Sequence, residues 1–135
     1  MSVETSYFKK EFNNPNAVSI AAKCPLFFKG REYKKLAPKY WFLKKYKQDG
    51  DKEFYIKKYF EEVLNKLDPK KVYNELGENS ILLCWESSEK FCHRHIVAEW
   101  LSKTIGVEIK EIDFEYNSEK IDDNFEWKSN EDTRV

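Results

Sequence analysis

Glycine, proline and cysteine are all scarce in this sequence of 135 residues, which contains four, four and three of them. So few glycines leave no glycine-rich loop to cradle a phosphate, and the chain has neither a Gly-x-Gly-x-x-Gly fingerprint nor a P-loop. We therefore expect no cofactor. Three cysteines are an odd number and too few for a disulfide scaffold, so we expect reduced thiols and a cytoplasmic location.

Long hydrophobic runs are also absent. No stretch approaches the roughly 18 apolar residues that a membrane helix needs, and the first ten residues lack the apolar run of a secretory signal. We expect no membrane association. Aromatic residues make up 16% of the chain, which is enough bulky material for one domain to bury a core without disulfides or metal.

The net charge is zero, but the two signs are separated along the chain. Residues 111–135 carry nine acidic and three basic side chains, so this stretch has a charge of −6 and the first 110 residues have a charge of +6. A basic body favours anionic partners. We expect one domain over residues 1–112 and an acidic, flexible tail over residues 113–135.

Hydrophobic periodicity and turn residues predict an α/β domain, a small parallel or mixed sheet of about four strands with helices packed on it. The ranges expected to be strands are 3–8, 17–22, 81–84 and 107–112. The ranges expected to be helices are 39–47, 51–67, 69–76 and 92–103. The run at 81–84 is continuously apolar, which is typical of a strand covered on both faces, and 107–112 alternates as an edge strand does.

A short loop joins the buried strand that ends at Cys84 to the helix that starts at Cys92. In open α/β sheets, ligands bind where strand ends lead into helix N-termini, which attract anions and favour thiolates. A helical wheel places His93 on the buried stripe of this helix and Cys92 and Arg94 at its two edges, whereas His95 points to solvent.

These positions indicate candidate catalytic residues. Cys92 offers a nucleophile, Glu86 or His93 can move a proton, and Arg94 can bind a phosphate or carboxylate. Each residue also has a plain structural alternative. Cys92 and Cys84 can be packing residues, His93 a buried imidazole, and Arg94 and Glu86 a salt bridge.

The same segment contains most of the residues able to bind a metal. With Cys24 at the end of the second strand, Cys84, Cys92 and His93 make a Cys₃His set. The chain has no Cys-x-x-Cys pair, and His93 and His95 project in different directions. We therefore assign no metal, and zinc remains an alternative.

Basic and aromatic residues alternate between Lys23 and Lys47, where nine basic side chains and one acidic one surround seven aromatic rings. Positive charge beside rings that stack on bases is how proteins bind single-stranded nucleic acid. The alternative is a solvated lysine surface over core aromatics, and no recognised binding motif is present. A nucleotide or nucleic acid is the expected partner, while the oligomeric state stays open.

Two stretches, Leu82–Glu86 and Phe91–Leu101, resemble the signature of the domain of unknown function 488 family, a group of uncharacterised bacterial and phage proteins. The likeness extends over nearly all of residues 3–112. The resemblance implies a compact α/β domain with its site at a Cys-x-Glu and a Cys-His-Arg element. It implies no established reaction.

The resemblance places the catalytic positions at Cys92, His93, Arg94 and Glu86. Some relatives have an arginine after the second strand, where this chain has Lys23 instead. The residues to which we assign ligand contacts are Cys84, Lys23, Ser19 and Arg31. Three functions remain open, namely a domain that binds a phosphate-bearing ligand with or without Cys-based catalysis, a non-catalytic nucleic-acid-binding module, and a zinc-binding or thiol-redox protein.

Overall fold

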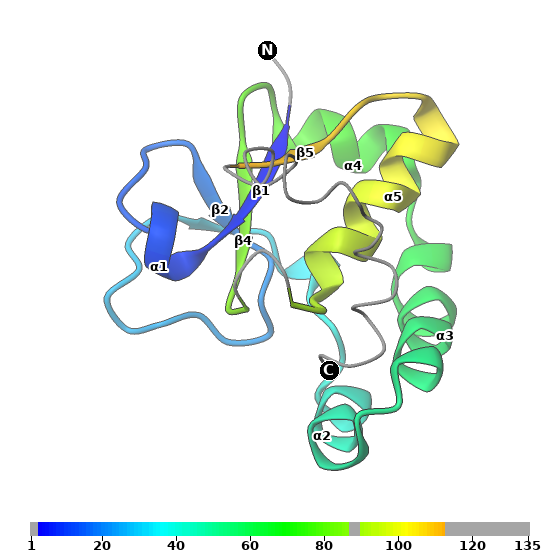
Figure 1. The fold of residues 1–135 in the computed structure, drawn as a ribbon. Coiled ribbons are helices and arrows are strands. Elements are labelled where there is room, and N and C mark those ends of the chain that lie inside the picture. The colour runs from blue at the N-terminus through cyan, green and yellow to red at the C-terminus, as the bar shows by residue number, and fades with distance from the viewer. Residues whose placement is uncertain (1–2, 87–89, 113–135) are drawn as a thin grey trace, which may run out of the picture.

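The computed structural model describes residues 3–86 and 90–112, so the expected acidic tail over 113–135 lies outside the described residues (Figure 1). One sheet has the strand order β3-β2-β4-β1-β5, and all its neighbouring strands are parallel. The strands are β1 (Glu4–Tyr7), β2 (Ala17–Ser19), β3 (Arg31–Glu32), β4 (Ile81–Cys84) and β5 (Lys110–Glu111). The predicted α/β fold is confirmed, with five strands in place of about four.

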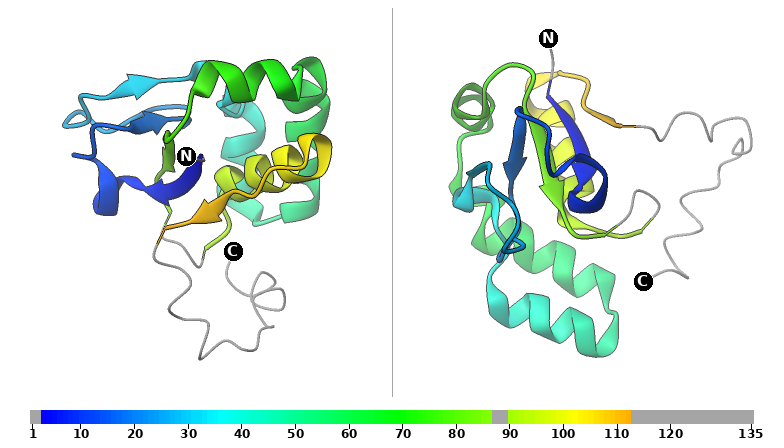
Figure 2. Two further views of the ribbon diagram at one scale, coloured as in Figure 1. Left: turned by 90° about the horizontal axis from the view of Figure 1, so that it is seen from above. Right: turned by 90° about the vertical axis from the view of Figure 1, so that its left-hand side faces the viewer.

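Helices cover both faces of this sheet unequally. The helices are α1 (Phe8–Glu11), α2 (Tyr40–Asp49), α3 (Lys52–Glu62), α4 (Pro69–Leu76) and α5 (His93–Ile105), with short 3₁₀ turns at Lys34–Leu36 and Leu64–Lys66. Helices α2 to α5 lie on one side and α1 on the other (Figures 1 and 2). Within the described residues, every helix is too short or too polar to cross a lipid bilayer.

Local sequence signals set the helix ends. Asp51 caps α3 by accepting a hydrogen bond from the Phe54 amide at 3.1 Å, and Asp68 caps α4 in the same way from the Lys70 amide at 3.1 Å. Gly106 ends α5 with a φ of +72°, which glycine adopts without strain. The four predicted helices are present, but the one predicted over 51–67 ends at Glu62 and is followed by the 3₁₀ turn Leu64–Lys66.

Strand β4 lies at the centre of the sheet, and all four of its residues are buried, as the apolar run predicts. It pairs with β1 on one side and β2 on the other, in a register that aligns Cys84 with Tyr7 and Leu83 with Ser19. The carboxyl ends of three strands therefore meet at one edge of the sheet. This edge is where open α/β sheets bind ligands.

Two short elements differ from the prediction. Arg31–Glu32 pairs with β2 as β3, where the sequence indicates only a loop around Gly30. A Cβ atom at Gly30 would lie 2.6 Å from the tip of the Phe28 ring and 3.1 Å from the Ala17 carbonyl oxygen, so a larger residue there would require Phe28 to shift. Helix α1 begins directly at Phe8, inside the range predicted as a strand. Elements of two to four residues are too short to show a period.

Candidate functional site

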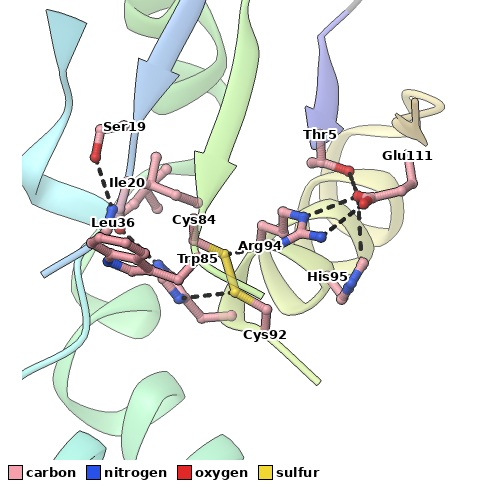
Figure 3. Close-up of a disulfide and its surroundings, with 12 residues drawn as sticks. Thr5, Ser19, Ile20, Leu36, Cys84, Trp85, Cys92, Arg94, His95 and Glu111 are labelled. Atoms are coloured by element: carbon pink, nitrogen blue, oxygen red, sulfur yellow. Dashed lines mark hydrogen bonds and ion pairs between the residues drawn. A yellow bond between two sulfur atoms is a disulfide. The ribbon is translucent and has the colours of Figure 1, made fainter. Parts of the chain in front are cut away.

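Cys84 and Cys92 are joined by a disulfide at the carboxyl edge of the sheet (Figure 3). Cys84 ends β4, Cys92 is the N-cap residue of α5, and both are buried. The expectation of reduced thiols is therefore wrong for this pair, and Cys84 is more than a packing residue. The odd cysteine count concealed the pair because the third cysteine, Cys24, is free.

Arg94 lies between this disulfide and the edge strand β5 (Figure 3). Its Nη1 donates a hydrogen bond to Cys84 Sγ at 3.1 Å, and its Nε and Nη2 donate to the two carboxylate oxygens of Glu111 at 3.0 and 2.7 Å. The side chain is fully buried. Arg94 therefore pairs with Glu111 and not with Glu86. It supplies a positive charge beside sulfur and offers no open site for a phosphate, which corrects its predicted role.

His93 is held in one tautomer by the end of β2. Its Nε2 lies 2.7 Å from the carbonyl oxygen of Ile20, which can only accept, so Nε2 carries the proton and Nδ1 of the neutral ring has a lone pair. Nδ1 lies 3.9 Å from Cys92 Sγ. Burial lowers the pKa of His93 to about 4, and the nearby Arg94 charge acts in the same direction. The ring is therefore neutral near pH 7.

His95 does not point to solvent as predicted. Its Nδ1 lies 4.0 Å from Glu111 Oε1, and 21% of its side chain is exposed. Burial lowers the pKa of His95 to about 4 as well. The prediction is wrong because Glu111 of β5 lies against this side of α5, which a helical wheel of α5 alone cannot show.

A pocket of about 560 Å³ opens beside the sulfur pair, and Cys84, Cys92, His93 and Glu86 line part of it. The aromatic residues of its wall are Tyr40, Tyr46, Tyr55, Trp85 and Phe91, and Lys23 and Lys47 are its two lysines. Trp85 Nε1 donates to the Lys23 carbonyl oxygen at 2.8 Å, which joins the loops after β4 and β2. Among the described residues, the pocket thus combines aromatic walls, the positive charges of two lysines, the carboxylate of Glu86 and a sulfur pair.

The predicted ligand-binding residues divide into two groups. Cys84 and Lys23 line the pocket, but Ser19 and Arg31 do not. Ser19 is buried, and its Oγ accepts a hydrogen bond from the Ala21 amide. Arg31 Nη2 donates to the carbonyl oxygens of Glu75 and Leu76 at 3.2 and 2.8 Å, so it caps the end of α4. These contacts give Ser19 and Arg31 structural roles.

Cys24 does not join the other potential metal ligands. Across residues 3–86 and 90–112, one group of three such side chains occurs, Cys84, Cys92 and His93, and their ligand atoms all lie within 4.8 Å of one another. The predicted Cys₃His set is therefore reduced to three members. Burial, with a smaller effect of Glu32, raises the pKa of the Cys24 thiol. Cys24 is accordingly a poorly reactive thiol near pH 7.

The basic aromatic segment does not form one continuous surface. Phe42 is buried in the core, while Tyr40 and Trp41 on the same helix are exposed. Lys45 forms an ion pair with Asp49 at 2.6 Å. Part of the segment therefore supports the core, and Tyr40 faces the pocket described above.

Comparison with known families matches residues 27–105 to the DUF488-N3a family model, described as the active DUF488-N3 subclade. The match covers more than half of the chain and includes both the Cys84–Glu86 and the Cys92–Arg94 elements. No curated protein and no solved structure matches significantly. The resemblance seen in the sequence is thus confirmed, and the chain belongs to the DUF488 family.

Proposed function

We propose that this chain is a thiol-disulfide redox protein, in which Cys84 and Cys92 react with a ligand bound in the pocket. The bonded sulfur pair on the pocket wall carries this proposal. In the reduced protein, the Arg94 guanidinium beside Cys84 favours the thiolate, which is the nucleophilic form. Cys92 lies close enough to resolve a bond made by Cys84.

The reaction takes place in two steps. The Cys84 thiolate attacks one sulfur of a disulfide R–S–S–R′, so that a Cys84–S–S–R bond forms and R′S⁻ leaves. Cys92 then attacks the Cys84 sulfur, the internal disulfide forms, and the departing RS⁻ takes the proton of Cys92 and leaves as RSH. The ligand gains two electrons and the protein loses two. A small thiol or a dithiol protein, oxidised in turn, restores the starting state.

The pocket favours a ligand with a flat ring and a negative charge. Tyr46, Trp85 and Phe91 supply surfaces on which a ring can stack. The two positive charges of Lys23 and Lys47 exceed the one negative charge of Glu86 on the same wall. A nucleotide has both features. The phosphate-bearing ligand expected from the sequence therefore remains part of the proposal, with its phosphate directed to the lysines and not to Arg94. The substrate class is a disulfide attached to such an anionic ring.

The aromatic reagent 5,5′-dithiobis(2-nitrobenzoate) tests this chemistry because it is a flat, anionic disulfide. In the Cys24→Ser variant, one equivalent should release two thiolates and leave an unlabelled protein with an internal disulfide. In the double variant Cys24→Ser with Cys92→Ser, release should stop at one thiolate, with the reagent bound to Cys84. Release of only one thiolate, with one label retained on the reduced Cys24→Ser protein, would contradict the proposal, because it would show that the two thiols react independently.

Non-catalytic nucleic-acid binding is a second candidate, favoured by the exposure of Tyr40 and Trp41 in the basic segment. Its test is a fluorescence titration with single-stranded DNA over a range of salt concentrations. Binding by phosphate contacts weakens as salt rises, so affinity without a salt dependence excludes this function. Removal of residues 113–135 should tighten binding if the acidic stretch competes for the basic segment. Unchanged affinity would refute that competition.

A further inference from the structure

We propose that the reduced Cys84–Cys92 pair and His93 together bind one divalent metal ion of the zinc class. The ligand atoms of all three residues lie within 4.8 Å of one another, and all three residues are buried. Thiolate and imidazole are the ligands that zinc takes most often in proteins. This inference goes beyond the redox function, since it needs the thiols in their reduced form but no turnover of a disulfide.

His93 is oriented as a metal ligand by its second hydrogen bond. Histidines that bind metals usually donate the other ring N–H to a carbonyl or carboxylate, which fixes both the tautomer and the ring plane. Here Nε2 bonds to the Ile20 carbonyl oxygen at 2.7 Å. Nδ1 is left facing Cys92 Sγ at 3.9 Å. The β2 strand end therefore holds the imidazole with its lone pair toward the sulfurs.

The spacing fits a tetrahedral ion once the disulfide is reduced. Zn–S bonds of about 2.3 Å and Zn–N bonds of about 2.1 Å place two sulfurs roughly 3.8 Å apart and a sulfur and a nitrogen roughly 3.6 Å apart. The observed separation of Nδ1 and Cys92 Sγ is already near the second value. The Cα atoms of Cys84 and Cys92 are 7.2 Å apart. This distance leaves room for two separate thiolates on one ion.

Arg94 lies on one side of the three proposed metal ligands, and the pocket lies on the other. Arg94 donates to Cys84 Sγ at 3.1 Å, so one thiolate has a hydrogen-bonded positive charge in its outer shell. Cys84, Cys92 and His93 all line the pocket. A fourth ligand would therefore come from the pocket side. Three protein ligands with one position open is the arrangement of catalytic zinc sites, whereas structural sites use four protein ligands.

Metal binding and disulfide formation exclude each other at this site, because both use the same two sulfurs. A bound ion protects the thiols from oxidation, and oxidation releases the ion. We expect zinc to slow the reaction of Cys84 with an aromatic disulfide. The metal content of the protein should follow its redox state.

The test uses the full-length Cys24→Ser protein, reduced and free of oxygen, titrated with Co²⁺ and then with Zn²⁺. We expect the protein to bind one Co²⁺ per chain and to show thiolate-to-cobalt absorption. This absorption should disappear when Zn²⁺ displaces the Co²⁺. Adding Cys92→Ser should weaken binding at least tenfold, while adding His95→Asn should leave it unchanged. Circular dichroism of each variant separates lost binding from lost folding, and Cys84→Ser provides a second test if Cys92→Ser fails to fold.

Two results would overturn the metal site: no cobalt bound to the reduced Cys24→Ser protein, or unchanged affinity in a folded variant that adds Cys92→Ser or Cys84→Ser. The aromatic disulfide assay is run separately with a chelator. If the protein forms the internal disulfide in that assay but binds no metal, only the metal site is disproved. If the protein binds metal but forms no internal disulfide, only the redox function is disproved.

Discussion

Arg94 and Glu111 form a buried, two-pronged ion pair that ties the first turn of α5 to the edge strand β5. Their side chains are 0% and 8% exposed. Thr5 of β1 donates to the same carboxylate at 2.6 Å, and the remaining guanidinium nitrogen of Arg94 bonds to Cys84 Sγ. The pair thus connects the stability of the fold to the position of the sulfur.

Replacing Glu111 by Ala leaves the buried Arg94 guanidinium without its carboxylate. We expect the free energy of unfolding to fall by about 3–5 kcal/mol, which is the usual cost of an uncompensated buried charge. Urea unfolding measures this loss. Glu108→Ala, which removes an exposed carboxylate, should cost less than about 0.5 kcal/mol. Equal losses in the two variants would show that the Arg94–Glu111 pair does not stabilise the domain.

Acid should destabilise the protein through His93. Its folded pKa of about 4 lies below the ordinary value of 6.5, so the unfolded chain binds a proton first as the pH falls. The stability contributed by the neutral ring is complete above pH 6.5 and is lost between pH 6.5 and 4, by about 3 kcal/mol. His95 acts with the same sign.

The measurement is the free energy of unfolding in urea at pH 7 and at pH 4.5. His93→Gln keeps a donor for the Ile20 carbonyl but does not titrate, so its stability should depend less on pH. A pH dependence as steep as that of the parent protein would exclude His93 as a source of the effect.

Arg94 should make Cys84 the most reactive thiol of the reduced protein. At pH 6–7 we expect iodoacetamide to label Cys84 at least tenfold faster than Cys24, whose pKa is raised by burial. Arg94→Lys keeps one charge but loses the planar fork that reaches both Glu111 and Cys84, so the Cys84 rate should fall. Cys24 in the same sample is the internal control. Equal labelling of both thiols in the parent protein would contradict this role of Arg94.

The two pocket lysines should select for charge on the ligand. Lys23→Ala combined with Lys47→Ala should slow the reaction of Cys84 with 5,5′-dithiobis(2-nitrobenzoate) several-fold. The rate with the neutral 2-hydroxyethyl disulfide should stay the same, which controls for damage to the thiols. If both rates fall together, the lysines do not act through the charge of the ligand.

The sequence predicts most of the fold because its longer elements have strong local signals. The apolar run at 81–84, the capping residues Asp51 and Asp68, and Gly106 each have a local physical meaning, and the structure confirms them. Strand β3 and helix α1 are stabilised by tertiary contacts. Both are too short to show the hydrophobic periodicity from which a strand or a helix is predicted.

The site is less predictable because its partners are distant in the sequence. Periodicity places Cys92, His93 and Arg94 in one turn, and all three are buried there. A helical wheel does not show that Glu111, 17 residues away, accepts hydrogen bonds from Arg94. The pairing of Cys84 with Cys92 likewise depends on how the intervening loop returns to the sheet edge. A strand end and an N-cap that both carry cysteine are the one signal that could have indicated it.

A redox titration of the Cys24→Ser protein in glutathione buffers, quenched by alkylation and followed by mass, tests the cysteine pair most directly. We predict one transition that involves two electrons, with a tenfold change in the equilibrium for about every 30 mV, and an oxidised form with an internal Cys84–Cys92 bond. Reduced protein throughout the titration, or oxidised protein carrying only glutathione adducts, would contradict the assignment of Cys84 and Cys92 as one redox unit.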